Sequence, residues 1–375
     1  QTFALLDPSG SPLTPFISWL DTRAEAEAAF LKEKLGPDFH RHSSFAYPLA
    51  GLQLANLLWL RRHAPQKLAQ TACIIPLPSW LTLQLAGVAA IDTNLAAMSG
   101  LYSMPLRDWW PPALELCGVT PQQMPALVAM GTPIPAVKTS PDLPLSPHLK
   151  IVFAGNDHTA GAYANHCRQG TVIATLGTAL VAYRFAGSRP GPFHPQGAWG
   201  FYPFGGFYEL ASRAYGCIAL DWACDCLFPG SEISSFLTYA QAAASSAAKR
   251  QTDPAFFFPS RFRGDTAWTG TADRDSRALA VLEGIGFALK QMIDEELQDG
   301  QTPASVCVIG GGSQSDFWLQ ILADIFHCPV RRGRGDSLAG AAAIAHPAAS
   351  PSDPSPDSSP SHTFQPVPAH PPRLR

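Results

Sequence analysis

The chain has 375 residues, of which 46% are hydrophobic and 15% charged, so it can build the cores of two ordinary domains. Its formal net charge of −3 argues against a general nucleic-acid binder, because no basic surplus exists to neutralise phosphates. No apolar run reaches the length of a membrane span.

The cysteine and histidine patterns predict no metal site. The eight cysteines are scattered without a CxxC pair, and the eleven histidines show no HExxH spacing. Most of the cysteines lie in apolar surroundings, so we expect the reduced, buried thiols of a cytoplasmic protein and not a disulfide framework.

The first third of the chain predicts a strand followed by several helices. The strand is expected at 2–7, and helices are expected at 24–35, 52–62, 79–85 and 92–98. Gly36–Pro37 is expected to end the first helix. Because a strand starts at once, with no Met and no signal-peptide pattern before it, the chain is interpreted as a fragment or a processed product.

The segment around Asp157 is typical of a strand that leads into a helix. A short apolar strand, Ile151–Phe153, runs through Gly155 to Asp157 at the start of the next helix. A carboxylate at the end of a strand can serve as a base for an acceptor hydroxyl in a phosphotransferase. The alternative is that Asp157 is only an N-cap of the helix.

A hairpin follows. Two β-rich runs, 171–176 and 179–185, are separated only by Gly177 and Thr178. Such a turn can touch phosphate through its backbone, or it can be an ordinary hairpin turn. Helices are then expected at the ranges 214–228, 237–248 and 278–297.

The last strong pattern is a buried-type strand at 306–309 that ends in Gly310, Gly311 and Gly312. Three glycines allow φ > 0 and let a flat ligand lie against the backbone. Ser313 is expected to cap the next helix, whose N-terminus favours an anionic ligand. The alternative is a tight turn that binds nothing, and no P-loop motif occurs in the chain.

Together these motifs resemble the FGGY carbohydrate kinase family, which includes xylulokinase, ribulokinase and glycerol kinase. The resemblance covers about residues 1–346. The matching segments are 17–23 (W-x-D-x-R), 91–96, 154–162, 176–179, 282–287, 310–318 and 338–342.

The resemblance implies an α/β fold of two ribonuclease-H/actin-like domains around a central cleft. The first, sugar-binding domain would span 1–168 and lack its N-terminal part, and the nucleotide-binding domain would span 169–346. The family's opening D-x-G-T turn has no counterpart here. A Pro/Ser-rich tail, 347–375, is expected to be disordered, although Phe364 and Pro366 can dock somewhere on the protein.

The resemblance also implies the roles of individual residues. Asp157 would be the general base, and the second substrate would be ATP with Mg²⁺. The ATP-binding residues would be Gly177, Thr178, Gly310, Gly311, Gly312 and Ser313.

On the sugar side, the implied residues are Trp19, Asp21 and Arg23. For these residues a structural interpretation remains open, with Trp19 in a core and Asp21 as the N-cap of the following helix beside Arg23. Asp92 is interpreted as a structural cap.

The first hypothesis is therefore an ATP-dependent kinase of a sugar or polyol, with no nucleic-acid or membrane partner and a homodimer as in much of the family. The second is a degenerate relative that binds sugar or nucleotide without turnover. An actin-like ATPase is a third, weaker alternative, and the sugar-side motif argues against it.

Overall fold

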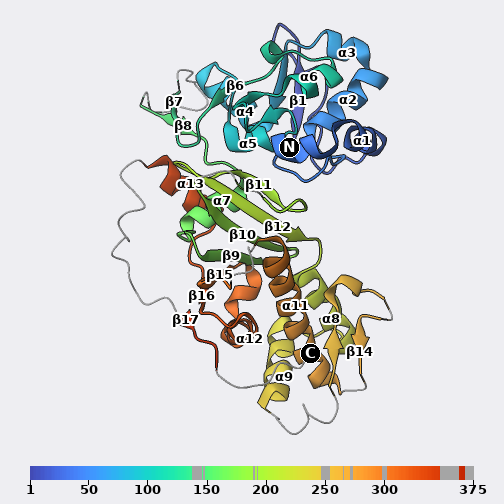
Figure 1. Cartoon of the computed structure of the whole chain (residues 1–375), viewed down its shortest axis with the longest axis vertical. Coiled ribbons are helices and arrows are strands. Elements are labelled where there is room, and N and C mark those ends of the chain that lie inside the picture. Colours follow the sequence, from blue (N-terminus) through green and yellow to red (C-terminus); the bar gives the residue numbers. More distant parts are fainter. Residues whose placement is uncertain are drawn as a thin grey trace. The chain divides into compact units, whose positions relative to one another are not determined.

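The computed structural model describes residues 1–136, 146, 148–188, 191, 193–245, 254–264, 266–270, 273–297, 302–346 and 363–367 (Figure 1). The chain has an α/β fold that divides into two compact units. The first unit contains Gln1–Tyr163, Gly187–Tyr208 and Ser337–Ala349. The second contains Ala164–Ala186, Glu209–Asp336 and Ser350–Arg375.

Short strand pairs and helices build the first unit. The antiparallel pairs are β1 (Phe3–Leu6) with β2 (Cys73–Pro76), β4 (Tyr102–Ser103) with β5 (Asp108–Trp109), and β7 (Pro133–Pro135) with β8 (Lys150–Val152). A parallel pair joins β3 (Ala90–Asp92) to β6 (Ala126–Val128). The helical elements are α1 (Glu25–His42), α2 (Gln53–His63), α3 (Pro65–Ala69), α4 (Leu77–Ala86), α5 (Thr93–Ala97), α6 (Pro111–Cys117), η1 (Pro121–Gln123), α7 (Asp157–Ala164, whose last residue belongs to the second unit) and α13 (Ser337–Ala345).

The helices expected in this part of the chain are confirmed. The first helical segment of α1 ends at Gly36–Pro37, as expected, and a second segment follows directly and continues to His42. Gly36 breaks the helix with φ 51° and ψ −141°, a conformation that a residue without Cβ adopts readily. The proline that follows fits the first turn of the new segment, where its missing N–H is not needed.

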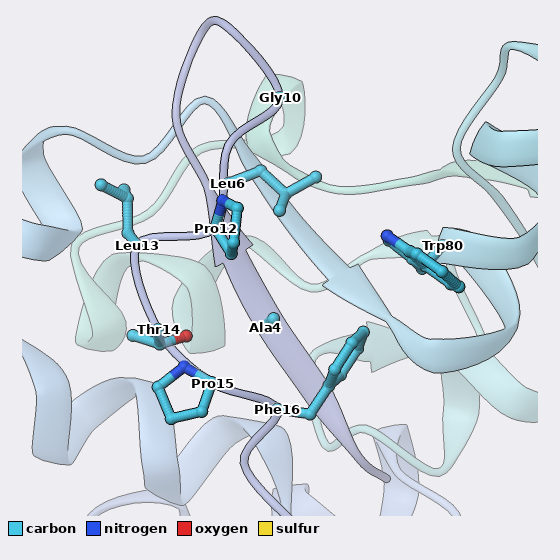
Figure 2. A pocket seen from close by; sticks show the side chains of 9 residues that line it. All are labelled: Ala4, Leu6, Gly10, Pro12, Leu13, Thr14, Pro15, Phe16 and Trp80. Carbon is cyan, nitrogen blue, oxygen red and sulfur yellow. The ribbon is translucent and has the colours of Figure 1, made fainter.

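The first unit holds an apolar hollow of about 510 Å³ beside β1 (Figure 2). Phe16 and Trp80 meet edge to face across it, with ring centroids 6.2 Å apart. No carboxylate lines the hollow, and none of the expected sugar-side residues does; its lining is Ala4, Leu6, Gly10, Pro12, Leu13, Thr14, Pro15, Phe16 and Trp80. Apart from the Thr14 hydroxyl and the Trp80 indole N–H, its lining side chains are apolar, so it offers few of the polar groups with which a sugar would be oriented.

A mixed sheet organises the second unit. Its strand order is β11-β12-β10-β9-β15-β16-β17, in which β9 pairs parallel with β15, and β15 parallel with β16. The strands are β9 (Thr171–Leu176), β10 (Leu180–Gly187), β11 (Ala198–Phe201, counted with the first unit), β12 (Phe207–Arg213), β15 (Ser305–Ile309), β16 (Val330–Arg332) and β17 (Thr363–Phe364). The other elements are α8 (Cys217–Leu227), α9 (Ile233–Ser245), β13 (Phe256–Phe257), η2 (Pro259–Arg261), β14 (Trp268–Thr269), α11 (Arg274–Glu296), η3 (Gly311–Gln314) and α12 (Asp316–Phe326).

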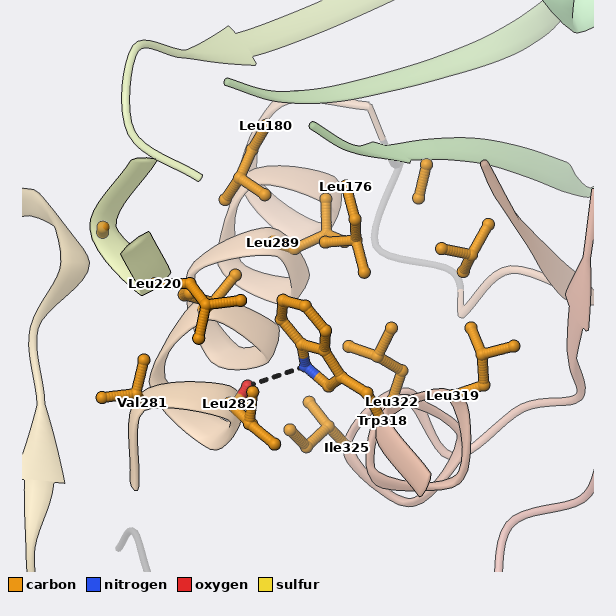
Figure 3. Packing of buried hydrophobic residues seen from close by; sticks show 14 of the residues in the cluster. Leu176, Leu180, Leu220, Val281, Leu282, Leu289, Trp318, Leu319, Leu322 and Ile325 are labelled. Carbon is orange, nitrogen blue, oxygen red and sulfur yellow. Dashed lines mark hydrogen bonds between the residues drawn. The ribbon is translucent and has the colours of Figure 1, made fainter. Parts of the chain in front are cut away.

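The core of the second unit lies between this sheet and its helices. Val172, Ala174 and Leu176 alternate along β9 and bury one face against α11 and α12. Trp318 of α12 lies at the centre, 1% exposed, and its indole N–H donates to the Leu282 carbonyl of α11 at 3.2 Å (Figure 3). A buried indole needs such a partner, so this contact fixes how α12 packs on α11.

The tail expected to be disordered is described only at residues 363–367, and the rest of it lies outside the described residues. Within these residues the expectation that Phe364 docks is confirmed, because its ring packs against the core. The strand was not expected: Thr363–Phe364 forms β17, which adds an antiparallel strand to β16. A further tertiary contact holds it, since the Val367 backbone N–H donates to Asp324 at 2.9 Å.

Candidate functional site

The carboxylate of Asp157 is exposed at the first residue of α7. The residue before it, Asn156, caps the helix, since its side-chain oxygen accepts the Thr159 backbone N–H at 2.8 Å. The N-cap alternative for Asp157 is therefore wrong. One Asp157 oxygen accepts the backbone N–H of His158 at 3.0 Å, and the exposed carboxylate keeps acceptor capacity for an alcohol.

The turn before α7 requires glycine. Gly155 has φ +74°, and a Cβ there would lie 2.8 Å from the sulfur of Met130 and 3.0 Å from Cγ of Asn94. Only a residue without a side chain fits this close approach. The turn thus brings the start of α7 against α5.

Asp92, in the β3–α5 turn, is a structural cap, as expected. Its carboxylate is fully buried and accepts the backbone N–H groups of Asn94 and Leu95 at 2.8 and 3.0 Å. Burial raises its pKa to about 6, although these hydrogen bonds act in the opposite direction. Because Asp92 has no exposed atoms to offer a substrate, its role lies in holding α5.

The expected sugar-side residues form two separate features. Asp21 and Arg23 make an ion pair at 2.7 Å at the surface, in which Arg23 is exposed and Asp21 is half-buried, and the guanidinium also lies over the Trp59 ring. The Arg23 side chain, by hydrogen bonding, lowers the pKa of Asp21. Asp21 does not cap α1, whose N-cap residue, Ala24, makes no side-chain cap bond. The pair is a surface motif with an anionic and a cationic end.

Trp19 is not a core residue. Its side chain is 61% exposed, and its backbone carbonyl lies against Gly51, where a Cβ would be only 2.0 Å from the oxygen. An exposed indole on an anchored backbone is suited to stack on the apolar face of a sugar ring. The alternative of a buried tryptophan is therefore wrong for this residue.

In the second unit, the hairpin turn joins the start of α8. Leu176 pairs with Leu180, so the turn contains Ala179 as well as the two expected residues, Gly177 and Thr178. The carbonyls of Gly177 and Thr178 accept the first N–H groups of α8, at 2.7 Å from Cys217 and 3.4 Å from Ile218. These bonds hold the turn from behind and leave Thr178 exposed.

The glycine loop after β15 packs against the same turn. A Cβ on Gly310 would lie 2.6 Å from the Leu176 carbonyl oxygen, and the φ of Gly310 is +91°. A Cβ on Gly312 would lie 2.8 Å from both Leu176 and Trp318, whereas a Cβ on Gly311 would meet nothing within 4 Å. The structure thus brings together the expected ATP-side glycines. Of the three loop glycines, Gly311 alone faces open space.

Ser313 does not cap α12, contrary to the sequence-based expectation. It is 2% exposed, and its hydroxyl donates to the Gly310 carbonyl at 2.7 Å. The cap is Ser315, which accepts the Trp318 backbone N–H at 3.2 Å. Ser313 closes the loop on itself, and the helix begins two residues later than predicted.

Two residues of this region were missed by sequence reasoning. Arg332 at the end of β16 donates to the carbonyls of Ser313 at 2.6 Å and Gln314 at 3.1 Å, and so clamps the loop from outside. Burial raises the pKa of the Cys217 thiol to about 11, and the neighbouring Gly312 backbone acts in the opposite direction. Both contacts arise from tertiary packing, and no local pattern marks them.

The eight cysteines are unpaired, and five of them are buried as expected. Cys73 and Cys217 are half-buried and Cys226 is exposed, so the expectation of buried thiols is wrong for these three. Within the described part of the chain, no cluster of three or more His, Cys, Asp or Glu side chains could hold a metal ion. Among the same residues, no helix combines the length and the apolar character needed to cross a bilayer.

The chain is similar in sequence to several sugar kinases. It is 29% identical to xylulose kinase from Escherichia coli (strain K12) over an alignment of 373 positions that covers 92% of this chain and 74% of the relative. It is 24% identical to L-fuculokinase from Salmonella typhi, covering 88% of this chain and 71% of that one.

Solved structures give the same fold. A xylulose kinase from Rhodospirillum rubrum matches with a TM-score of 0.83 at 22% identity, covering 98% of this chain and 78% of that chain. A ligand-bound xylulose kinase from Lactobacillus acidophilus matches with a TM-score of 0.80 at 20% identity, covering 92% and 73% respectively.

Family profiles account for most of the sequence. The N-terminal domain of the FGGY family of carbohydrate kinases matches residues 1–163, and the C-terminal domain matches residues 240–349. The described fold, the exposed carboxylate at the start of α7 and the glycine turns of the second unit are consistent with both matches. The chain belongs to the FGGY family of carbohydrate kinases.

Proposed function

We propose that Asp157 is the general base of this ATP-dependent carbohydrate kinase. The observation that carries the proposal is that Asn156, and not Asp157, caps α7. The Asp157 carboxylate therefore stays exposed and is not used to accept the helix N–H groups at the cap. The carboxylate takes the proton of a sugar hydroxyl while the hydroxyl oxygen attacks the γ-phosphorus of ATP. The bond between that phosphorus and the β,γ-bridging oxygen breaks, and ADP leaves.

We assign the nucleotide to residues 169–346. Thr178 is exposed on a turn held by α8, so its hydroxyl and backbone can meet phosphate oxygens without rearrangement. Gly311 presents open backbone to the adenosine, while Gly310, Gly312 and Ser313 keep the loop in shape from within. Of the expected ATP-side residues, Thr178 and Gly311 would therefore contact the nucleotide. The loop conformation would be maintained by Gly310, Gly312 and Ser313.

Mg²⁺ is part of the proposal through the nucleotide. The described residues offer no preformed cage of acidic side chains. Kinase sites commonly take Mg²⁺ with several waters, the substrate phosphates and one or two carboxylates. The ion would neutralise charge on the phosphates.

We assign the acceptor to residues 1–168 and propose a ketose, with xylulose as the first candidate because several relatives are xylulose kinases. Trp19 offers an exposed ring for the carbon face of a sugar, and the Asp21–Arg23 pair offers both an acceptor and donors for hydroxyl groups. The free thiols fit a cytoplasmic enzyme.

The test is sugar-dependent formation of ADP from ATP, measured with a panel of ketoses, aldoses and polyols that includes xylulose and fuculose. The proposal predicts ADP and a stoichiometric amount of sugar phosphate with at least one acceptor, and no ADP without a sugar. ADP formation that ignores the sugar, or no turnover with any acceptor while ATP still binds, contradicts the proposal.

A further inference from the structure

A network of buried amides stands behind the Asp157 carboxylate, and every member lies in the first unit. The side-chain oxygen of Asn94 accepts both the backbone N–H and the side-chain N–H₂ of Asn156, each at 3.0 Å. Asn94 is fully buried and Asn156 is 7% exposed. The Asn156 amide also donates to the hydroxyl of Tyr208 at 3.3 Å. The residue next to the proposed base is thus held from two sides.

Backbone groups fix the orientation of both amides. The Asn94 N–H₂ donates to the Phe201 carbonyl at 2.8 Å and to the Thr159 hydroxyl at 3.2 Å. The Asn156 oxygen accepts the Thr159 backbone N–H at 2.8 Å. A carbonyl can only accept and a backbone N–H can only donate, so neither amide can flip without losing a bond. The hydrogen bonds that link the two amides to the first turn of α7 therefore permit only one orientation of each amide.

The network is itself tied to α5. Asp92 accepts the backbone N–H of Asn94 at 2.8 Å, and Gly155 allows the two turns to approach closely. The backbone of Asn94 is therefore fixed by Asp92, at the start of α5. The side chain of Asn94 in turn fixes Asn156, at the start of α7. Every polar atom of the Asn94 and Asn156 side chains has a hydrogen-bond partner, and buried amides satisfied in this way hold a single geometry.

From these contacts we infer that Asn94 and Asn156 are positioning residues for the Asp157 carboxylate, an inference that rests on the proposed function. They do not touch the reacting atoms. Asn156 sets the direction in which α7 starts, and Asn94 prevents Asn156 from moving. A general base must lie within hydrogen-bond reach of its proton, and a displacement of about 1 Å can lower the rate about 100-fold.

Asn94→Ala and Asn156→Ser test the inference, because the first removes the link and the second keeps a capping oxygen but loses the amide N–H₂. We expect kcat to fall about tenfold or more in Asn94→Ala and less in Asn156→Ser, with KM for ATP within about twofold of wild type. The matched control is Asp273→Ala, which removes the cap of α11 at Ser276, and its kcat should not change. Wild-type kcat in both folded test variants, or an equal loss in the control, overturns the inference.

A double-mutant cycle with Asp157→Asn separates positioning from a general structural role. If Asn94 acts through Asp157, Asn94→Ala should have less than a twofold effect on the residual turnover of Asp157→Asn, measured at high enzyme concentration. An unchanged tenfold effect in that background overturns the inference while leaving the proposed base intact. Wild-type kcat in Asp157→Asn alone overturns the proposed base and the inference with it.

Discussion

Adding a methyl group at two adjacent glycines of the proposed nucleotide loop should change protein stability differently. We expect a loss of stability at Gly312 and none at Gly311. In Gly312→Ala, the new Cβ would lie 2.8 Å from Cβ of Leu176 and 2.8 Å from the Trp318 ring. Carbon atoms pack at about 3.5–4.0 Å, so the loop or the core must move. In Gly311→Ala, the new Cβ would meet nothing within 4 Å, and the backbone there is not in the positive-φ region.

The magnitudes follow from overpacking. Inserting a methyl group into a well-packed core destabilises by about 1–3 kcal/mol, which for a unit of this size lowers Tm by roughly 2–12 °C. Gly311→Ala should leave stability unchanged or raise it by up to about 1 kcal/mol, because alanine narrows the unfolded ensemble. If Gly311 faces the adenosine, however, KM for ATP should rise about fivefold or more in that variant.

Thermal unfolding and steady-state kinetics on the two variants form the assay, with wild type beside them. A Gly312→Ala variant as stable as wild type would show that the close contacts with Leu176 and Trp318 carry no strain, contrary to the prediction. An equal loss of stability in Gly311→Ala would contradict it as well. Wild-type KM for ATP in Gly311→Ala would remove Gly311 from the nucleotide site.

Two further predictions concern a buried acid and a clamp. Burial raises the folded pKa of Asp92 to about 6, so its contribution to stability is full below its unfolded pKa of about 3.9 and is lost as pH rises through 6. The free energy of unfolding of wild type relative to Asp92→Asn should therefore fall by on the order of 2–3 kcal/mol between pH 4 and 7 in urea titrations, and a constant difference would contradict this account. Arg332→Lys should raise KM for ATP about five- to tenfold, because an ammonium cannot reproduce the fork that holds the Ser313 and Gln314 carbonyls. An unchanged KM for ATP, or an equal change in KM for the sugar, would show that Arg332 does not act through this loop.

The sequence allowed the elements to be predicted better than their ends. The periodic runs at 52–62 and 278–297 became α2 and α11, because an apolar face that repeats every turn needs only a core to pack against. The caps were harder. Asn156 and Asp157 are both good capping residues, as are Ser313 and Ser315, and only the backbone conformation decides which residue stands outside the helix.

The candidate site was predictable where residues are adjacent in sequence and not where packing unites them. Glycine was expected at Gly310 and Gly312 for a ligand, and the structure adds a packing reason, because a Cβ at either position would meet Leu176 and at Gly312 also Trp318. The Arg332 clamp joins segments far apart in the chain, so no local pattern could indicate it. The spacing of glycines in the sequence identifies the unusual turns. Which residues those turns contact is decided by the tertiary packing and cannot be read from the local sequence.

The most direct test of the role of Asp157 is a measurement of kcat for Asp157→Asn with the best sugar acceptor. Because the side chain is exposed and makes no cap bond to the helix, the variant should unfold within a few degrees of wild type. Removal of the general base should lower kcat by about 100-fold or more. A folded variant whose kcat stays within twofold of wild type would show that another group takes the proton.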